Sequence, residues 1–350
     1  MLEVEENLDM PSAFELRLPI NRTAEGDLTF INDDTFTPFS EIAVVATAEN
    51  QPPECIFDGV VLSHRLHLER GNTRSTLAVW GQDASWRMNL EEKTREWADM
   101  TDGTAANQIF GEYGFAPAPE NLDNDSPMHA STAQSLMQRD TDIQFLRRLG
   151  RRTGKLVRVA CQTVPGVRIG YFGRPSLDAP ASVTLVINDP ENWNVAALDV
   201  EWDVARPNAV VAGQKLFTDT SEGVESDLTS SPLSPLGDRT LDAFAGESAR
   251  TRLTTVTSDG GDLDLRAQAV LVESGWFIHA RGEAEVSRLK KVLRAGQIVA
   301  VSSIGSLHSG SYLVWSVRHT IAPDAHRMSF HLVRNAIGSP GPAAAFAGGF

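Results

Sequence analysis

The chain has 350 residues, 41% of them apolar and 22% charged, which is enough for a buried core. Because a domain usually contains about 100–200 residues, a chain of this length is expected to form two or three domains. Ordinary Gly and Pro content excludes collagen and wholesale disorder, and two cysteines exclude a disulfide framework. The acidic start is unlike a signal peptide, and no apolar run reaches the ~20 residues that span a bilayer. We therefore expect a soluble protein, made in a reducing compartment, with no membrane insertion.

The acidic residues are concentrated in the first part of the chain. Residues 1–150 contain 26 Asp and Glu against 11 Lys and Arg, a balance of −15, whereas residues 151–350 contain 20 of each. This excess argues against tight binding of nucleic-acid phosphates by the first part, because such binding requires clustered basic residues. A plain solubilising role for the acids is the alternative.

Apolar residues alternate with polar ones over most of the chain, which is typical of strands with one buried face. Phe14, Leu16, Leu18 and Ile20 form the first such series. The predicted strands cover residues 14–20, 60–68, 75–80, 276–286, 297–301, 312–320 and 328–334.

Helical signals are confined to the middle of the chain. A short helix is expected over 104–114, with Thr104 as its cap. A second follows Thr141, which forms a capping-box pattern with Gln144, and it ends at Gly154. Residues 218–262 are rich in Ser, Thr, Asp, Gly and Pro and predict a long loop or exposed excursion.

No motif for catalysis, cofactor binding or metal binding stands out. His319, His326 and His331 lie close in sequence, but their spacing matches no zinc signature, and packed, hydrogen-bonded histidines are the simpler interpretation. The G-x-S-x-G, HExxH, P-loop and G-x-G-x-x-G patterns are absent. We therefore expect no cofactor and nominate no catalytic residue. Glycoside cleavage stays open, because 46 acids always offer some pair about 5–9 Å apart.

A basic segment interrupts the acidic surroundings at the end of the second helix. Arg147, Arg148, Arg151 and Arg152 fall in its last two turns. One interpretation is a solvated helix face that complements the helix dipole. The other is a docking surface for an acidic partner, such as the acidic first domain of a neighbouring subunit.

Several strings resemble one family. QRDTDIQFLRRLGRRTG at 138–154 resembles a helix of the late-control D family of tailed-phage proteins, which recurs in the hub portion of the VgrG spike proteins of type VI secretion. WGQDA at 80–84 is similar to the segment that precedes the family's helical region. The family's closing pattern is followed in order by LRAGQIVAV at 293–301, SGSYLV at 309–314, VRHTI at 317–321 and FHLVRNA at 330–336.

The resemblance implies a mainly β fold with a helical insert (α+β), built from two related β-barrel domains and a small helix-containing domain. The implied division is a first barrel, a helix-containing domain, a second barrel that carries the 218–262 excursion, and a flexible tail, at 1–95, 96–175, 176–336 and 337–350. Within the family pattern, Gly296, Gly310, Tyr312 and His319 are expected to determine the fold: the glycines in turns, the other two packed in strands.

The function that the resemblance implies is structural and not enzymatic. It is that of a baseplate hub of a contractile phage tail or a tail-like injection system, a homotrimer that adapts the six-fold tail tube to the three-fold spike. A separate spike protein, tail-tube proteins and other baseplate proteins would be its partners, and DNA or protein cargo would pass the lumen without specific binding. Its place would be the baseplate of a virion or injection particle, assembled in the bacterial cytoplasm.

Two other functions remain open on sequence alone. One is a peptidoglycan-degrading baseplate hydrolase, and the other is a generic β-rich binding module. The choice between phage, bacteriocin and extracellular injection system is likewise open.

Overall fold

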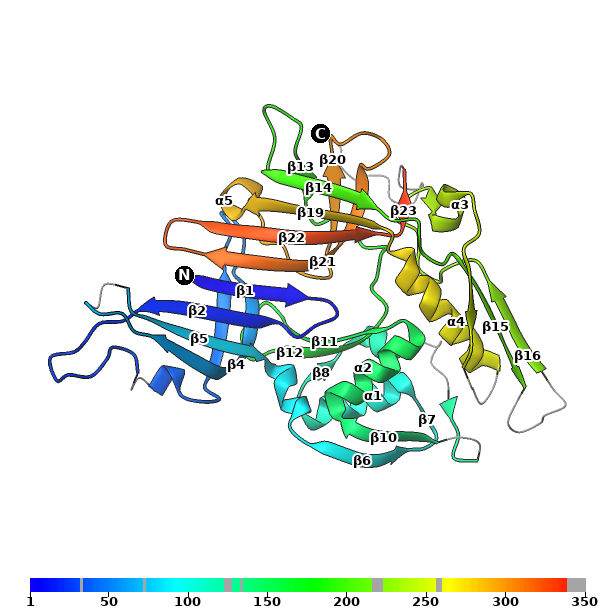
Figure 1. Ribbon diagram of the computed structural model, residues 1–350, viewed down its shortest axis with the longest axis horizontal. Helices are drawn as coiled ribbons and strands as arrows, with labels where there is room; N and C mark the ends of the chain where they lie inside the picture. Colours follow the sequence, from blue (N-terminus) through cyan, green and yellow to red (C-terminus); the bar gives the residue numbers. More distant parts are fainter. Residues whose placement is uncertain are drawn as a thin grey trace.

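The structure is a computed structural model (Figure 1). It describes residues 1–31, 34–71, 74–122, 128–132, 135–215, 223–255 and 260–338. Strands outnumber helices throughout, so the predicted mainly β, α+β class is confirmed. No helix among the described residues is long and apolar enough to cross a membrane.

One large sheet dominates the described part of the chain and has eleven strands. Its main path runs β14-β19-β22-β21-β1-β2-β5-β4-β3, with β20 on β21 and β13 on β20. In Figure 1 these strands lie side by side from β14 at the top to β4 below. Their bounds are β1 Leu2–Asn7, β2 Ala13–Pro19, β3 Glu41–Ala46, β4 Glu54–His67, β5 Thr76–Asp83, β13 Thr184–Val186, β14 Ala197–Trp202, β19 Ile278–Glu285, β20 Ile298–Ser302, β21 Gly310–Ile321 and β22 His326–Arg334. A short 3-10 helix, η1, spans Asp34–Phe36.

The two ends of the chain meet in this sheet. Strand β1 pairs antiparallel with β2 on one side and with β21 on the other, so that Val4 lies opposite both Phe14 and His319. A single apolar core contains buried residues from both ends, among them Val4, Phe14, Val317 and Phe330. The predicted closed barrels do not form as closed sheets in the described residues; because β1 is shared, the strands make one open sheet.

The two longest strands are bent by bulges. In β4 the pairing register with β5 shifts between Val61 and Ser63, and in β21 the register with β22 shifts between Val314 and Ser316. On its other edge β21 pairs with β20 before this bulge and with β1 after it. Bulges increase the local twist, so each long strand changes direction where its partners change.

A helical unit follows the first strands and lies below the sheet in Figure 1. Trp97, Phe110, Phe145, Leu146 and Phe172 belong to its separate apolar core. Its helices are α1 Asp102–Glu112, α2 Asp142–Thr153, and the 3-10 helices η2 Ala84–Asn89 and η3 Pro119–Leu122. Its strands are β6 Glu92–Trp97, β7 Met100–Thr101, β8 Ala116–Pro117, β9 Met128–His129, β10 Leu136–Thr141, β11 Leu156–Cys161 and β12 Arg168–Gly173.

Both predicted helices exist, with different caps. Helix α1 begins at Asp102, and the cap is Thr101, whose hydroxyl accepts from the Thr104 amide at 3.2 Å. Thr141 precedes α2, but its hydroxyl donates to Asn89 at 2.8 Å and makes no capping bond, so the predicted capping box is wrong. Gly154 ends α2 in the left-handed conformation, as predicted.

The segment predicted as a long loop or exposed excursion, 218–262, contains strands and helices as well as loop in the part that the structure describes. Residues 216–222 and 256–259 lie outside the described residues. In the rest, β16 and β18 pair with β15, β17 pairs with β23, and α3 and the first residues of α4 are helical, whereas 229–238 and 246–249 contain no helix or strand. Val210 of β15 and Ala267 and Leu271 of α4 form a small core beside this segment. Bounds here are β15 Ala209–Lys215, β16 Gly223–Leu228, β17 Arg239–Thr240, α3 Leu241–Ala245, β18 Arg250–Leu253 and α4 Gly260–Gly275.

Two further departures concern the end of the chain. The strand predicted over 276–286 ends at Glu285, and a one-turn helix, α5 Val286–Leu289, follows it. Ile337 is predicted to lie in the tail but is buried in β23 Ala336–Ile337, which pairs with β17. Residues 339–350 lie outside the described residues.

Gly310 and Tyr312 lie around one buried side chain, that of Arg334. Its guanidinium donates to the carbonyl of Leu236 at 2.8 Å and to that of Ser309 at 3.2 Å. The Tyr312 ring faces this guanidinium at 5.3 Å, and its hydroxyl donates to the His308 carbonyl at 2.7 Å. Arg334 therefore joins the end of β22 to the loop before β21 and to the 218–262 segment.

His319 is fully buried beside β1, and its Nδ1 lies 3.0 Å from Nε2 of His326. Burial lowers the pKa of His319 to about 3, so the ring is neutral at ordinary pH. His331 belongs to a different pair, in which its Nε2 lies 3.0 Å from Nδ1 of His279. The three histidines are thus divided between two packed pairs, and no group of three potential ligands exists in the described residues.

Gly310 should not tolerate a side chain. Its φ is +141°, and a Cβ there would meet Nη2 of Arg334 at 2.6 Å. We expect Gly310→Ala to lower the free energy of unfolding by about 2 kcal/mol, because the guanidinium is held by carbonyls and has nowhere to move. Urea unfolding measures the loss.

Gly111→Ala is the matched control, since Gly111 lies in α1 and a Cβ there has nothing within 4 Å. Alanine at this position should be neutral or stabilising. Equal stabilities of the two variants would contradict the assignment of Gly310.

Candidate functional site: the basic helix and the charged junction

Helix α2 is held by its first residue. The Asp142 carboxylate is fully buried and accepts from Lys93, Tyr113 and Gln138, each at 2.6 Å. Burial alone would raise the pKa of Asp142, but these hydrogen bonds lower it below its ordinary value. Because Lys93 and Gln138 lie on β6 and β10, the two strands fix where α2 begins.

The four arginines predicted to form a docking surface do not share one face of α2. Arg148 and Arg151 are exposed, and Arg148 pairs with Asp140 at 2.8 Å. Arg152 is largely buried and donates to Asp102 at 3.0 Å. Arg147 is half-buried, and burial lowers its pKa while the nearby Asp83 carboxylate opposes that shift.

A cleft of about 720 Å³ lies between α2 and α4. Its charged side chains are mostly basic. They are Arg148, Arg151, Arg152 and Arg266, with His129 and the acids Asp262 and Glu273. Arg266 pairs with Asp262 at 2.9 Å, whereas no ion pair to Arg151 occurs in the described part of the chain. Three of its four arginines, Arg148, Arg152 and Arg266, are thus paired with acids. The α4 wall of this cleft was not predicted from the sequence.

A buried triad stabilises the basic side of this cleft. Asp102 is fully buried and contacts Nε2 of His129 at 2.7 Å and the Arg152 guanidinium at 3.0 Å. It thereby joins the start of α1, strand β9 and the end of α2. No local sequence pattern indicates this contact, because the three residues come from three separate elements.

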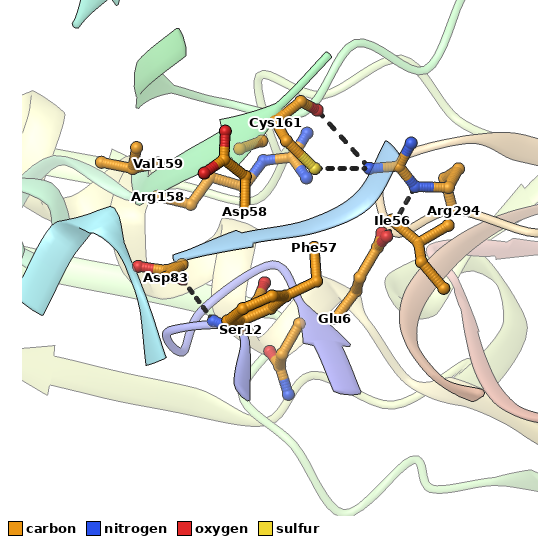
Figure 2. Close-up of a pocket in the computed structure, with 12 residues that line it drawn as sticks. Glu6, Ser12, Ile56, Phe57, Asp58, Asp83, Arg158, Val159, Cys161 and Arg294 are labelled. Carbon is orange, nitrogen blue, oxygen red and sulfur yellow. Dashed lines mark hydrogen bonds and ion pairs between the residues drawn. The ribbon is translucent and has the colours of Figure 1, made fainter. Parts of the chain in front are cut away.

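A second charged group lies where the helical unit meets the sheet. Figure 2 shows Arg294 between Glu6 of β1 and Cys161 of β11. Arg294 donates to Glu6 at 2.5 Å, and the amide of Ala295 donates to the same carboxylate at 3.1 Å. Arg158 of β11 donates to the Ala295 carbonyl at 3.1 Å. We call Glu6, Arg158, Arg294 and Cys161 the junction.

Burial dominates the electrostatics of the junction. It raises the pKa of Glu6, although Arg294 and Arg158 both oppose that shift, and it lowers the pKa of Arg158. Gly296 lies next to this group at φ +91°, where a Cβ would meet Nη2 of Arg158 at 2.9 Å. Gly296 is thus required for close approach of the backbone to Arg158.

Two more carboxylates attach the helical unit to the sheet. Asp58 of β4 accepts from Arg168 of β12 and from the Gly166 amide, both at 2.6 Å. Asp83, at the end of β5, accepts from the backbone amides of Ser12 at 2.5 Å and Ser85 at 2.9 Å. Burial raises the pKa of Asp83 to about 6. These contacts place α2 and its arginines relative to the sheet.

Residues 2–182, just over half of the chain, match the family model of the Alg8 N-terminal domain. The chain belongs to this family. The match covers β1 to β12, and so both the first half of the large sheet and the helical unit of this Alg8 N-terminal domain protein. It is a different family from late-control D, which stays a resemblance. No curated protein matches this chain.

Solved structures share the fold over nearly the whole chain. A 43 kDa tail protein of prophage MuSo2 from Shewanella oneidensis is 15% identical with a TM-score of 0.69, over 96% of this chain and 94% of that one. A tail protein from Neisseria meningitidis is 14% identical with a TM-score of 0.65, over 97% and 94%. A type VI secretion component from E. coli, described as similar to bacteriophage T4 tail proteins, is 12% identical with a TM-score of 0.59, over 98% and 76%.

At these identities the likeness establishes the fold: this Alg8 N-terminal domain protein is built like phage tail proteins. The similarity includes the second half of the chain, which the family model does not reach.

Loss of the Glu6 charge should destabilise the protein strongly. Glu6→Gln leaves Arg294, whose side chain is 15% exposed, without its close carboxylate; Glu54 lies farther away at 3.8 Å. We expect the free energy of unfolding in urea to fall by about 3 kcal/mol, the scale for removing one member of a buried ion pair.

The neighbouring residue provides the control. Glu5 pairs with Arg318, but both side chains are about half exposed, and Glu5→Gln should cost less than about 1 kcal/mol. If the two variants lose the same stability, the junction does not stabilise the contact between the helical unit and the sheet.

Proposed function

We propose that the protein is the structural hub of a baseplate in a contractile phage tail or tail-like injection system, as in late-control D and VgrG hubs. In this proposal it forms a homotrimer that adapts a six-fold tail tube to a three-fold spike. The observation that carries the proposal is the fold shared with tail proteins over more than nine-tenths of this chain.

The two halves of the large sheet support the proposal that one trimer can contact both a six-fold tube and a three-fold spike. One half is built from β2, β5, β4 and β3, and the other from β21, β22, β19 and β14, with β1 between them. Each half is antiparallel and contains one long bulged strand, β4 or β21. In the proposal each half is one barrel-like domain, so three chains supply six units around a ring that still has three-fold symmetry.

The sheet edges support contacts between subunits. In the described residues β3 and β14 each pair on one side only, and such edges invite pairing with another chain. Large apolar side chains are exposed at or beside these edges: Phe39 is 59% exposed, and Val45 and Trp202 are each 47% exposed. A second copy would cover them.

The remaining roles follow from this arrangement. The division at residues 95, 175 and 336 into two sheet domains, a helical domain and a tail is part of the proposal. The cleft between α2 and α4, with Arg148 and Arg151 at its surface, would dock an acidic segment of a neighbouring subunit or baseplate protein. A separate spike protein and the tail tube would bind the two faces of the ring, cargo would pass the lumen without specific binding, and the particle's baseplate would be its location.

A trimer is the direct consequence. Native mass spectrometry should find an assembly of three times 38.1 kDa, about 114 kDa. In the same measurement Arg151→Glu should lower the trimer fraction if the cleft docks a neighbouring subunit, because it places an acid against an acidic segment.

Arg70→Glu, at another exposed arginine, should leave the trimer fraction unchanged. A trimer that Arg151→Glu leaves intact would contradict docking between subunits but not the hub. A monomer at every concentration, or one that degrades peptidoglycan, would contradict the hub itself.

A further inference from the structure

A pocket of about 250 Å³ lies between the end of α4 and the start of α3 (Figure 1). Leu271, Ser274 and Gly275 of α4 form one wall, and residues 240–242 form another. The pocket shares no lining residue with the cleft between α2 and α4. A single bound water needs only ~10–15 Å³, so this pocket has room for a small organic group.

Two buried asparagines hold the walls of the pocket in place. Asn335 accepts from the Leu236 amide at 2.9 Å and donates to the Ser234 carbonyl at 3.0 Å. Asn208 makes the same two kinds of contact with the backbone of the loop 247–249, both at 2.8 Å. Both asparagines line the pocket, so its shape is fixed before any ligand binds, and binding has to order few residues.

Ser274 lines the pocket as a buried hydroxyl that the protein does not use. The residue is only 7% exposed, and its Oγ has no hydrogen-bond partner among the described residues. Buried hydroxyls are nearly always hydrogen-bonded, because an unpaired one loses its contacts with water and gains nothing in return. A ligand in the pocket can supply the missing partner.

The charge around the pocket is negative. Asp242 is the one acid that lines it, and no Lys, Arg or His lines it among the described residues. The Thr240 hydroxyl donates to Oδ1 of Asp242 at 2.5 Å and so orients the carboxylate. The C-terminal end of α4 adds the negative end of a helix dipole. Both features favour a cationic group.

Apolar side chains complete the lining. They come from three leucines, Leu233, Leu241 and Leu271, and from two prolines, Pro207 and Pro235. An alkyl chain can bury itself against these side chains, whereas a neutral polyol would leave them uncovered. A ligand that is apolar along its stem and positive at its end therefore matches the pocket.

We propose that this pocket binds a primary ammonium group on an unbranched alkyl stem, the chemistry that free aliphatic diamines and lysine side chains share. The stem contacts the leucines, and the ammonium donates to Ser274 Oγ and to the Asp242 carboxylate. This inference does not depend on the hub proposal.

Ligand-observed NMR with 1,5-diaminopentane tests the pocket on the full-length chain. Saturation transfer to the diamine should titrate to a plateau at millimolar concentration. Pentane-1,5-diol has the same stem and no charge, and it should bind at least about tenfold more weakly, because hydrogen bonds to a charged group are the stronger ones. Nα-acetyl-lysine amide forms the second arm: equal or tighter binding than the diamine identifies a lysine side chain as the ligand, and binding of the diamine alone identifies a free diamine.

Ser274→Ala separates a binding role from a structural one. It should weaken diamine binding about tenfold, yet leave the free protein as stable as before or more stable, because it removes an unpaired buried hydroxyl. Ser226→Ala is the matched control: Ser226 is 5% exposed and its Oγ also has no partner among the described residues, but it does not line the pocket. Diamine binding should be unchanged in this control.

Asp242→Asn should weaken diamine binding about threefold, the scale of an exposed ion pair, and should reduce its salt dependence. Equal binding of the diol and the diamine, unchanged diamine binding in Ser274→Ala, or no saturable signal from either amine would each overturn the proposal.

Discussion

The pairing of β1 with β21 is the contact on which the architecture depends. The six residues of β1, at the start of the chain, pair with β21 of the β21–β22 hairpin, which lies more than 300 positions later. In this register Leu2 lies opposite Ile321 and Asn7 lies opposite Ser316. Closing so long a loop costs only slightly more entropy than closing a short one, because the cost grows with the logarithm of length. The fully buried Val4 and Val317 repay it within one core. Without this pairing the chain would contain two smaller sheets with two more exposed edges.

The second constraint is electrostatic. Glu6, on that same β1 strand, is placed between Arg294 and Arg158, so the strand that joins the two half-sheets also holds the helical unit. Buried charges contribute little net stability compared with apolar packing, but removing one partner is costly, and they permit few alternative arrangements. The junction therefore specifies where the helical unit lies more than it stabilises the fold. Because α2 is part of the helical unit, the junction also determines where the α2 wall of the cleft lies.

The sequence predicted local structure well where one periodicity dominated. Every strand predicted from alternation exists, as in β2 and β22, since one buried face imposes a period of two. Strand β4 is the exception in detail: it begins six residues before the predicted start at residue 60, and its burial does not alternate. Helix α4 was missed although its buried positions include Leu263, Ala267 and Leu271 at helical spacing, because its first residues, 260–262, continue the polar, Gly-rich composition that suggests a loop. Buried contacts such as Arg334 with Leu236, or Asp102 with His129, unite distant segments and leave no local pattern. The resemblance to phage tail proteins agrees with the fold comparison, and no sheet among the described residues closes into a barrel.

The central claim is that both ends of the chain form one cooperative sheet through β1 and β21. Native-state hydrogen exchange measures this directly, because amides that open only on global unfolding exchange slowest. The account predicts that the inter-strand amides of β1, β21, β2 and β22 exchange together, at the rate of global unfolding. It would be contradicted if the amides of β1 to β5 exchanged as a separate, faster group while those of β19 to β22 stayed protected.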